Sequence, residues 1–248
     1  MVTARTAART VREALMVAGV DVSHLTVDNA APTGRAVVLV DEAAENSIVV
    51  ISGANATLNP GNITEAAEAV EEAAVVLAQL EVPLEVIRKA AQRSKGIFVL
   101  NPAPACPLDP EILELVDVMV VNEGEFEIVF GQPVPEDSTR LGEILARRKA
   151  PASLVVTLGG RGALIWANGE ATLIPAPSVK VVDTTGAGDT FVGALGNALA
   201  RSESLLDAAM WAVCAASLST QSLGASSGMP TDVAVRKFQG DLAPVSGQ

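Results

Sequence analysis

Short apolar segments alternate with helix-favouring segments through the middle of this chain, and that alternation restricts the fold more than any other feature. Three such pairs follow one another: 75–80 with 84–93, 97–100 with a short helix near Glu111, and 118–121 with 123–130. Strands that alternate with helices predict a parallel sheet covered by helices. Two further apolar runs, 154–157 and 163–166, predict an antiparallel hairpin that extends the sheet.

A second hairpin is predicted nearer the start of the chain. Residues 36–40 and 47–51 are β-rich, and the polar segment 41–46 separates them. The chain has 248 residues, 49% of them hydrophobic, which suffices for a large core. We therefore expect an α/β fold with three αβα layers, in which helices flank a mostly parallel sheet, formed by residues 1–248 as a single domain.

Charge and rare residue types disfavour several classes of function. A net charge of -12 makes nucleic acid and anionic membranes poor partners. No apolar run reaches the roughly 18 residues of a membrane span. The only histidine, His24, lies in a polar stretch, which disfavours Ser-His-Asp and histidine-zinc hydrolases. Cys106 and Cys214 lack CxxC spacing, so neither a zinc site nor a disulfide framework is indicated, and a reducing cytoplasm fits.

The segment 181–191 is β-rich and ends in a glycine turn that carries Asp189. Small residues that open into a helix present free backbone N–H groups, which attract anions, whereas a carboxylate there repels a phosphate. The two features agree if Asp189 takes the proton of a neutral hydroxyl while the N–H groups of 186–188 stabilise a transferred phosphoryl group. On these residues alone, Asp189 as a helix N-cap is an equally good interpretation.

The residues after this turn predict a helix. Apolar side chains recur at helical spacing and form one stripe, made of Phe191, Ala194, Leu195, Ala198 and Leu199. We expect Gly193 and Gly196 to let this helix lie close to a neighbour. P-loop and dinucleotide-binding folds are disfavoured, because the glycines match neither the P-loop pattern nor GxGxxG.

The segment 183–194 resembles the C-terminal signature of the ribokinase-like sugar kinases, the phosphofructokinase-B-type family. Further segments resemble that family in the same order: 33–34, 53–55, 79–83, 101–105, 122–125, 157–162, and 224–225 with Pro230. The resemblance implies that 35–55 is what remains of a small β lid over the sugar. It also implies that the first strand of the family and its Asn-x-Asp and Gly-Gly motifs are absent, on the order of fifty residues.

The resemblance assigns roles to individual positions. Asp189 is implied as the general base on the primary hydroxyl of the sugar, and the implied anion hole consists of Gly186, Ala187 and Gly188. Asn122 and Glu125 are implied to organise water around Mg²⁺ and the ATP phosphates, although the same spacing is also a helix capping box. Glu81 matches a sugar-binding position. The positions implied to contact ATP are Thr157, Leu158, Gly159, Gly160, Arg161, Gly162, Gly188 and Val213.

A monovalent cation, K⁺, is implied beside the anion hole. The matching positions are Asp183, Thr185, Ser219, Ser222, Gly224 and Gly228, which would bind mostly through carbonyl oxygens. Relatives usually carry a serine at the last of these positions. We therefore expect Gly228 to weaken or rearrange the cation site, and Gly228→Ser to raise the affinity for K⁺.

These motifs predict an ATP-dependent sugar kinase. The resemblance of segments 79–81 and 101–105 to members of this family implies D-ribose as the sugar, with D-ribose 5-phosphate and ADP as products. Two alternatives remain open: a kinase for another sugar or nucleoside, and a truncated, non-catalytic nucleotide-binding protein. The expected partners are a small sugar and ATP, without nucleic acid or membrane. We expect a cytoplasmic protein that is a homodimer in its full-length form.

Overall fold

The central sheet contains six strands, and their spatial order follows the chain, β3-β4-β5-β6-β7-β8. In the computed structural model, which describes residues 4–40 and 46–242, strands β3 to β6 run parallel and β7 and β8 are antiparallel. The strands span Val75–Gln79 (β3), Ile97–Asn101 (β4), Val118–Asn122 (β5), Ser153–Thr157 (β6), Ala163–Ala167 (β7) and Glu170–Ile174 (β8). The parallel part and the β6–β7 hairpin are as predicted. Strand β8 was not predicted; it is only five residues long, and of these only Ile174 is buried.

Alternate residues of the parallel strands point to opposite faces of the sheet, and both faces are apolar. Val99 and Val120 lie in the core on one face. Phe98, Leu100 and Met119 lie in the core on the other face. None of these five side chains is more than 2% exposed. Burial on both faces requires a helical layer on each side of the sheet.

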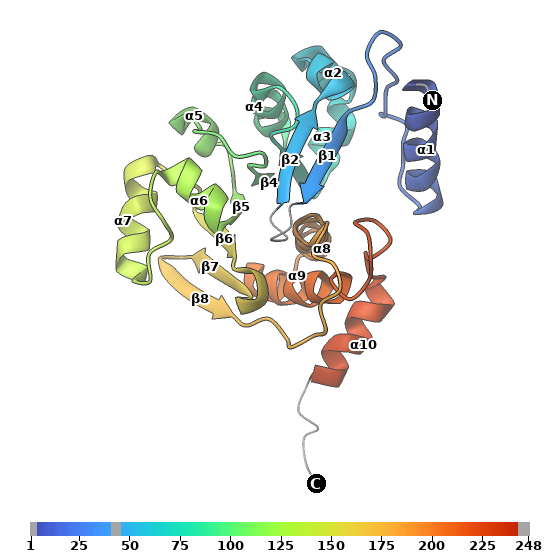
Figure 1. Cartoon of the computed structure of the whole chain (residues 1–248). Helices are drawn as coiled ribbons and strands as arrows, with labels where there is room; N and C mark the ends of the chain where they lie inside the picture. The colour runs from blue at the N-terminus through green and yellow to red at the C-terminus, as the bar shows by residue number, and fades with distance from the viewer. Residues whose placement is uncertain (1–3, 41–45, 243–248) are drawn as a thin grey trace.

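Helices provide both layers (Figure 1). On the Val99 face lie α8 (Ala187–Ala200), α9 (Leu205–Ser219) and α10 (Asp232–Leu242). On the Phe98 face lie α4 (Leu84–Arg93), α5 (Pro110–Leu113), α6 (Glu123–Phe130) and α7 (Ser138–Arg148). The predicted three-layer α/β class is confirmed.

Helix α8 packs with its predicted apolar stripe inward. Phe191, Leu195 and Leu199 are buried against the sheet and α9. The prediction of close approach is right for Gly196, where an added Cβ would lie 2.9 Å from Cδ2 of Leu77 on β3. It is wrong for Gly193, where an added Cβ would meet nothing within 4 Å, because that side of the helix faces a cavity.

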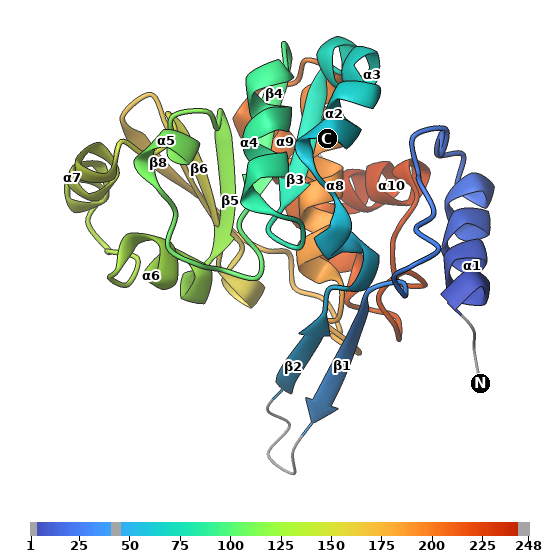
Figure 2. The same ribbon diagram turned by 90° about the horizontal axis from the view of Figure 1, so that it is seen from above.

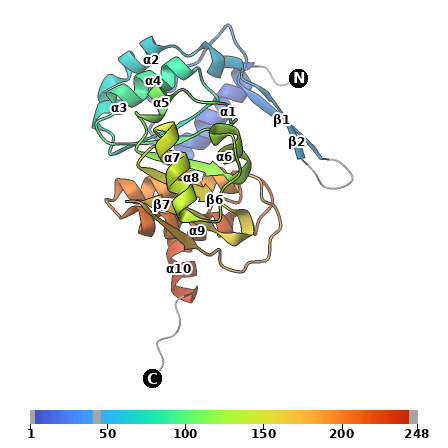
Figure 3. The same cartoon turned by 90° about the vertical axis from the view of Figure 1, so that its left-hand side faces the viewer.

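The predicted early hairpin forms a separate two-stranded antiparallel sheet, β1 (Arg35–Val40) with β2 (Asn46–Ile51). Residues 41–45 of the predicted turn lie outside the described residues. This sheet projects away from the body of the molecule (Figures 2 and 3). It is the small antiparallel sheet that the sequence led us to expect as the lid.

The remaining elements complete the chain. They are α1 (Ala4–Val17), α2 (Pro60–Glu65), α3 (Ala67–Glu72) and the short 3-10 helices η1 (Gly53–Thr57) and η2 (Gly159–Arg161). Helices α2 and α3 pack against α4, whereas α1 lies at the periphery (Figure 2). Over residues 4–40 and 46–242, no helix is long and apolar enough to span a membrane.

Candidate active site

Polar side chains end each of the four parallel strands. Gln79, Asn101, Asn122 and Thr157 are the last residues of β3, β4, β5 and β6. Gln79 is in register with Asn101, and Asn122 is in register with Thr157. Because parallel strands place their carboxyl ends at one edge, these side chains form a row there. Ligand sites of open α/β sheets occur at this edge.

The start of α8 faces this row. Gly186 is the N-cap, with φ of 77°, and it provides no capping side chain. Its positive φ and the neighbouring Ala225, whose Cα would lie 3.0 Å from an added Cβ, both favour glycine. Ala187 and Gly188 follow in the first turn, where backbone N–H groups lack intrahelical partners. The Ala187 N–H donates to the carbonyl of Thr184 at 3.1 Å, whereas the N–H groups of Gly186 and Gly188 have no recorded partner among the described residues. Both glycines line the cavity at the strand ends.

Asp189 is the third residue of α8 and not its N-cap. The capping interpretation of this residue is therefore wrong, because Gly186 occupies the cap position. The Asp189 carboxylate accepts a hydrogen bond from Nε2 of Gln79 at 3.2 Å. It lines a cavity of about 170 Å³ together with Asn101, Asn122, Glu125, Thr157, Gly186 and Gly188.

Asn122 and Glu125 form the predicted capping box at the start of α6. The Asn122 side chain accepts from the N–H of Glu125, and the Glu125 carboxylate accepts from the N–H of Asn122, both at 2.8 Å. Burial raises the pKa of Glu125 above its usual 4.5, and hydrogen bonds from Asn122 and Asn101 oppose that rise. Both residues also line the Asp189 cavity, so capping leaves them available to a ligand there.

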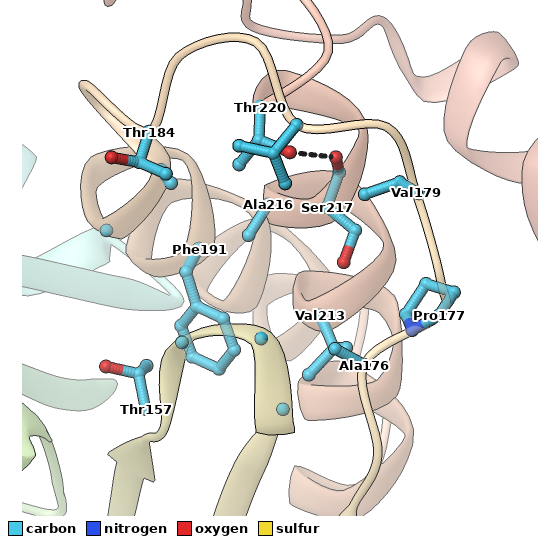
Figure 4. Close-up of a pocket in the computed structure, with 16 residues that line it drawn as sticks. Thr157, Ala176, Pro177, Val179, Thr184, Phe191, Val213, Ala216, Ser217 and Thr220 are labelled. Atoms are coloured by element: carbon cyan, nitrogen blue, oxygen red, sulfur yellow. Dashed lines mark hydrogen bonds between the residues drawn. The ribbon is translucent and has the colours of Figure 1, made fainter.

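A second cavity, of about 220 Å³, adjoins the first, and Thr157 and Gly188 line both. Its walls are apolar at Pro177, Val179 and Val213, and Figure 4 shows Pro177 and Val179 on the segment after β8, beside α9, which carries Val213. Its polar side chains are hydroxyls: Thr157, Thr184, Ser217 and Thr220. A mostly apolar cavity that Gly188, at the start of α8, also lines suits a flat aromatic base with a phosphate tail.

The glycine-rich loop after β6 contributes only part of its length to this second cavity. Gly159, Gly160 and Gly162 line it. Leu158 packs instead against the core on the Phe98 face, and Arg161 is not among the lining residues.

The positive charge of Arg161 is already paired. Its Nη2 donates to Oε1 of Glu123 at 2.6 Å, and this contact raises the pKa of the arginine. For Arg161 to contact ATP, as the resemblance implies, this exposed ion pair has to open.

The residues matched to the cation site surround the loop that precedes α8. The Asp183 carboxylate accepts from Thr185 and from the N–H of Gly224, so it ties two loops together and leaves backbone carbonyls as the available ligands. An added Cβ at Gly228 would lie 2.7 Å from the Ser219 carbonyl oxygen and 3.1 Å from that of Gly224. Two carbonyls therefore converge where a larger residue would sit, and Gly228→Ser cannot fit without moving them.

Glu81 is not among the residues that line the Asp189 cavity. It is exposed and lines a different cavity, beside α4, of about 310 Å³. The side chain of this segment that contacts Asp189 is Gln79.

Two site features were missed from the sequence. Gln79 and Asn101 lie in segments that resemble the family, but no role was predicted for them. The available signal was a polar residue at the carboxyl end of a parallel strand. The cavity wall at Ala176, Pro177, Val179 and Val181 was also missed, because an irregular segment after β8 carries no periodic pattern.

The family can now be stated from comparison with known proteins. The profile of the family described as pfkB family carbohydrate kinase matches residues 2–232. The chain belongs to this family. It is thus an ATP-dependent sugar kinase, with a small sugar and a nucleotide as its partners.

Several proteins with similar sequences and structures are ribokinases. A ribokinase of Haemophilus influenzae is 34% identical over 227 residues, which cover 90% of this chain and 74% of the relative. A ribokinase structure from Thermotoga maritima has a TM-score of 0.82 and 30% identity, covering 94% of this chain and 77% of that one. An Arabidopsis thaliana ribokinase complexed with ribose and ATP has a TM-score of 0.77 and 31% identity, covering 85% and 70%.

Proposed function

We propose that this pfkB-family chain is a ribokinase, which transfers the γ-phosphoryl group of ATP to D-ribose to give D-ribose 5-phosphate and ADP. The observation that carries this proposal is that Thr157 and Gly188 line both cavities. The mostly apolar cavity that suits a base therefore adjoins the cavity lined by the start of α8 and by the Asp189 carboxylate. The 34% identity to a ribokinase supports ribose as the sugar.

The chemistry follows from this alignment. Asp189 accepts the proton of the primary hydroxyl of ribose while that oxygen forms a bond to the γ-phosphorus. The bond from the γ-phosphorus to the bridging oxygen breaks, and ADP leaves with its electron pair. The N–H groups of Gly186 and Gly188 stabilise the negative charge on the transferred group, and the N–H of Ala187 joins them when its hydrogen bond to the Thr184 carbonyl opens. The base thus acts on the attacking hydroxyl, and the anion hole acts on the transferred phosphoryl group.

The residues proposed to bind ATP and Mg²⁺ line the same two cavities. The glycine loop at Gly159, Gly160 and Gly162 and the side chain of Val213 form the walls against the nucleotide. Asn122 and Glu125 offer oxygen donors, which suit the hard ion Mg²⁺ and its retained waters. When bound, Mg²⁺ neutralises charge on the ATP phosphates. Within the described residues no three His, Cys, Asp or Glu side chains converge on one metal position, so in this proposal water and phosphate oxygens supply the other ligands.

The proposed ligands of K⁺ are mainly backbone carbonyl oxygens. The carbonyls of Ser219 and Gly224 converge beside Gly228, and the Asp183 carboxylate holds the two loops in place. Oxygen ligands of this kind suit K⁺, which would fix the loop ahead of the anion hole. Thr185 and Ser222 are proposed as further carbonyl ligands.

Three broader proposals accompany this function. We propose that residues 1–248 form a single domain, since one sheet organises both core layers. A homodimer is supported by the projecting β1–β2 sheet, on which Val50 and Ile51 are 43% and 53% exposed. A cytoplasmic location is supported by the free thiols of Cys106 and Cys214. Sedimentation and fractionation measurements test the last two.

The function is tested by measuring ADP release with D-ribose, D-fructose and adenosine as acceptors. Ribose is expected to give the highest kcat/KM, and ³¹P–¹H correlation is expected to place the new phosphate on C5. Calorimetric titration with ATP and Mg²⁺ accompanies the assay. ATP binding without transfer to any acceptor would favour the non-catalytic alternative, and a preference for another acceptor would name a different kinase.

A further inference from the structure

Gln79 makes the one hydrogen bond that the structure records for the Asp189 carboxylate within the described residues. Nε2 of Gln79 donates to Oδ1 of Asp189 at 3.2 Å, between residues 110 positions apart. The contact leaves Oδ2 free. Gln79 lies on β3 and Asp189 on α8, so the packing of the helix on the sheet decides whether the two side chains meet.

A carboxylate in the first turn of a helix has a competing partner. The free N–H groups and the helix dipole attract a negative side chain at this position. If Asp189 turned toward the start of α8, its carboxylate would occupy the N–H groups that the transferred phosphoryl group needs. The base would then block the anion hole of its own active site.

Two other helices of this chain show that competition. Glu125 is the third residue of α6, and its carboxylate accepts from the N–H of the N-cap Asn122 at 2.8 Å. Asp207 is the third residue of α9, and its carboxylate accepts from the hydroxyl of the N-cap Ser204 at 2.6 Å. Both acids thus turn back to their own caps. Asp189 holds the same position in α8 and is turned to Gln79 instead.

Gln79 is itself held in orientation by the next strand. Its Nε2 lies 3.5 Å from Oδ1 of Asn101, its partner in the β3–β4 register. Nδ2 of Asn101 donates to the carbonyl of Val120 on β5 at 2.9 Å, which directs Oδ1 of Asn101 toward Gln79. The amide nitrogen of Gln79, not its oxygen, therefore faces Asp189.

We propose that Gln79 is a positioning residue that holds Asp189 away from the N–H groups of α8, so that the base and the anion hole remain separate. The catalytic consequence rests on the proposed kinase function, whereas the hydrogen bond does not. Gln79 touches neither ribose nor phosphate in this proposal. It acts through Asp189 alone.

The kinetic test uses Gln79→Met, which keeps the side-chain length and removes the donor. The exposed Gln92 of α4 offers a matched control, Gln92→Met. We expect Gln79→Met to lower kcat about 10-fold, the size of one lost hydrogen bond to a charged group, with KM for ATP changed less than about twofold. In an Asp189→Asn background, Gln79→Met is expected to cause no further loss, because no base remains to be positioned. Wild-type kcat in Gln79→Met, or additive losses in the double variant, would overturn the proposal.

A second measurement does not require activity. The side-chain amide of Gln79 is identified in a ¹⁵N–¹H spectrum by its loss in Gln79→Met. Its signal is expected to shift in Asp189→Ala and to stay in place in Asp207→Ala, which removes the corresponding acid of α9. A Gln79 amide signal that does not shift in Asp189→Ala would refute the contact, even in a protein without kinase activity. An inactive wild type whose signal shifts as expected would refute only the proposed function.

Discussion

The backbone N–H of Gly224 donates to Oδ2 of Asp183 at 2.8 Å, which joins residues 41 positions apart in sequence. Oδ1 of the same carboxylate accepts from Oγ1 and from N–H of Thr185 at 2.7 and 2.9 Å. One carboxylate therefore connects the loop before α8 to the loop after α9. These are the two loops that carry the proposed cation ligands, so Asp183 organises them through its side chain.

Asp183→Asn is expected to lower the melting temperature at neutral pH, and the difference from wild type is expected to close in acid. Hydrogen bonds from the Thr185 hydroxyl, the Gly224 N–H and the Thr185 N–H hold the pKa of Asp183 below its usual 3.8. A carboxyl whose pKa is lowered by folding stabilises the protein above its unfolded pKa, and this contribution is lost as pH falls through the folded pKa. Thermal melts from pH 7 down to below 3.8 measure the difference.

Thr185→Val provides an intermediate case, because it removes only the hydroxyl donor. A smaller loss with the same pH dependence is expected. A melting difference for Asp183→Asn that stays constant well below pH 3.8 would show that the ionised carboxylate is not the stabilising group.

Asp189→Asn is expected to reduce kcat at least about 100-fold, the size typical of losing a general base. The asparagine keeps the shape of the side chain and can still accept from Gln79, but it cannot take the proton of the sugar. Melting temperature and ATP affinity are expected to stay at wild-type values. Steady-state kinetics and calorimetry measure both, and turnover near the wild-type rate would remove Asp189 from the role of base.

Glu125→Gln is expected to preserve the α6 cap and to weaken the response to Mg²⁺. Glutamine can accept the same N–H of Asn122, so the capping box survives. Burial holds the pKa of Glu125 above 4.5, so protons compete with Mg²⁺ at a higher pH than they would at a free glutamate. The Mg²⁺ concentration for half-maximal rate should therefore rise as pH falls toward that raised pKa.

Folding raises the pKa of Glu125 and lowers that of Asp183, so the two carboxyls change the stability of the protein with pH in opposite directions. A carboxyl whose pKa is raised by folding stabilises below its unfolded pKa, and this contribution is lost as pH rises through the folded pKa. Glu125→Gln should therefore be tolerated at neutral pH. Glu127→Gln, an exposed change on the same helix, is the control. An Mg²⁺ response in Glu125→Gln that matches wild type at every pH would contradict the assignment.

Two glycine-to-alanine changes are expected to shift stability in opposite directions. At Gly228, the added Cβ would meet the Ser219 carbonyl oxygen at 2.7 Å, so Gly228→Ala should lower the free energy of unfolding by about 1–3 kcal/mol, as overpacking does. At Gly193, inside α8, the Cβ would meet open space, so Gly193→Ala should raise it by about 0.5–1 kcal/mol. Denaturant titration measures both.

The close approach of the Ser219 carbonyl to Gly228 leads us to expect the opposite effect of Gly228→Ser on K⁺ binding from the one expected from the sequence. Gly228→Ser should weaken activation by K⁺, because its Cβ displaces the carbonyls of Ser219 and Gly224 that are proposed to bind the ion. The measurement compares rates in K⁺ and in choline at equal ionic strength. Stronger K⁺ activation in Gly228→Ser would show that the loop can open to admit the hydroxyl as a ligand.

Local patterns predicted much of this protein correctly. The apolar run at 118–121 and the spacing of Asn122 and Glu125 place β5 and the start of α6 where the structure has them. The stripe from Phe191 to Leu199 correctly predicts the buried face of α8. Such features depend on residues within about one turn or one strand of each other, so sequence spacing alone specifies them.

The sequence by itself determined which segments become strands and helices, that both faces of the sheet are apolar, and that an acid follows the glycine turn before α8. Only the tertiary structure decided which partners these side chains meet. Gln79 reaches Asp189 because α8 packs on β3, and Gly228 must stay small because the Ser219 carbonyl from the end of α9 points at it. Those contacts join residues far apart in the chain, and their distances depend on strand order and helix packing, which no local spacing encodes.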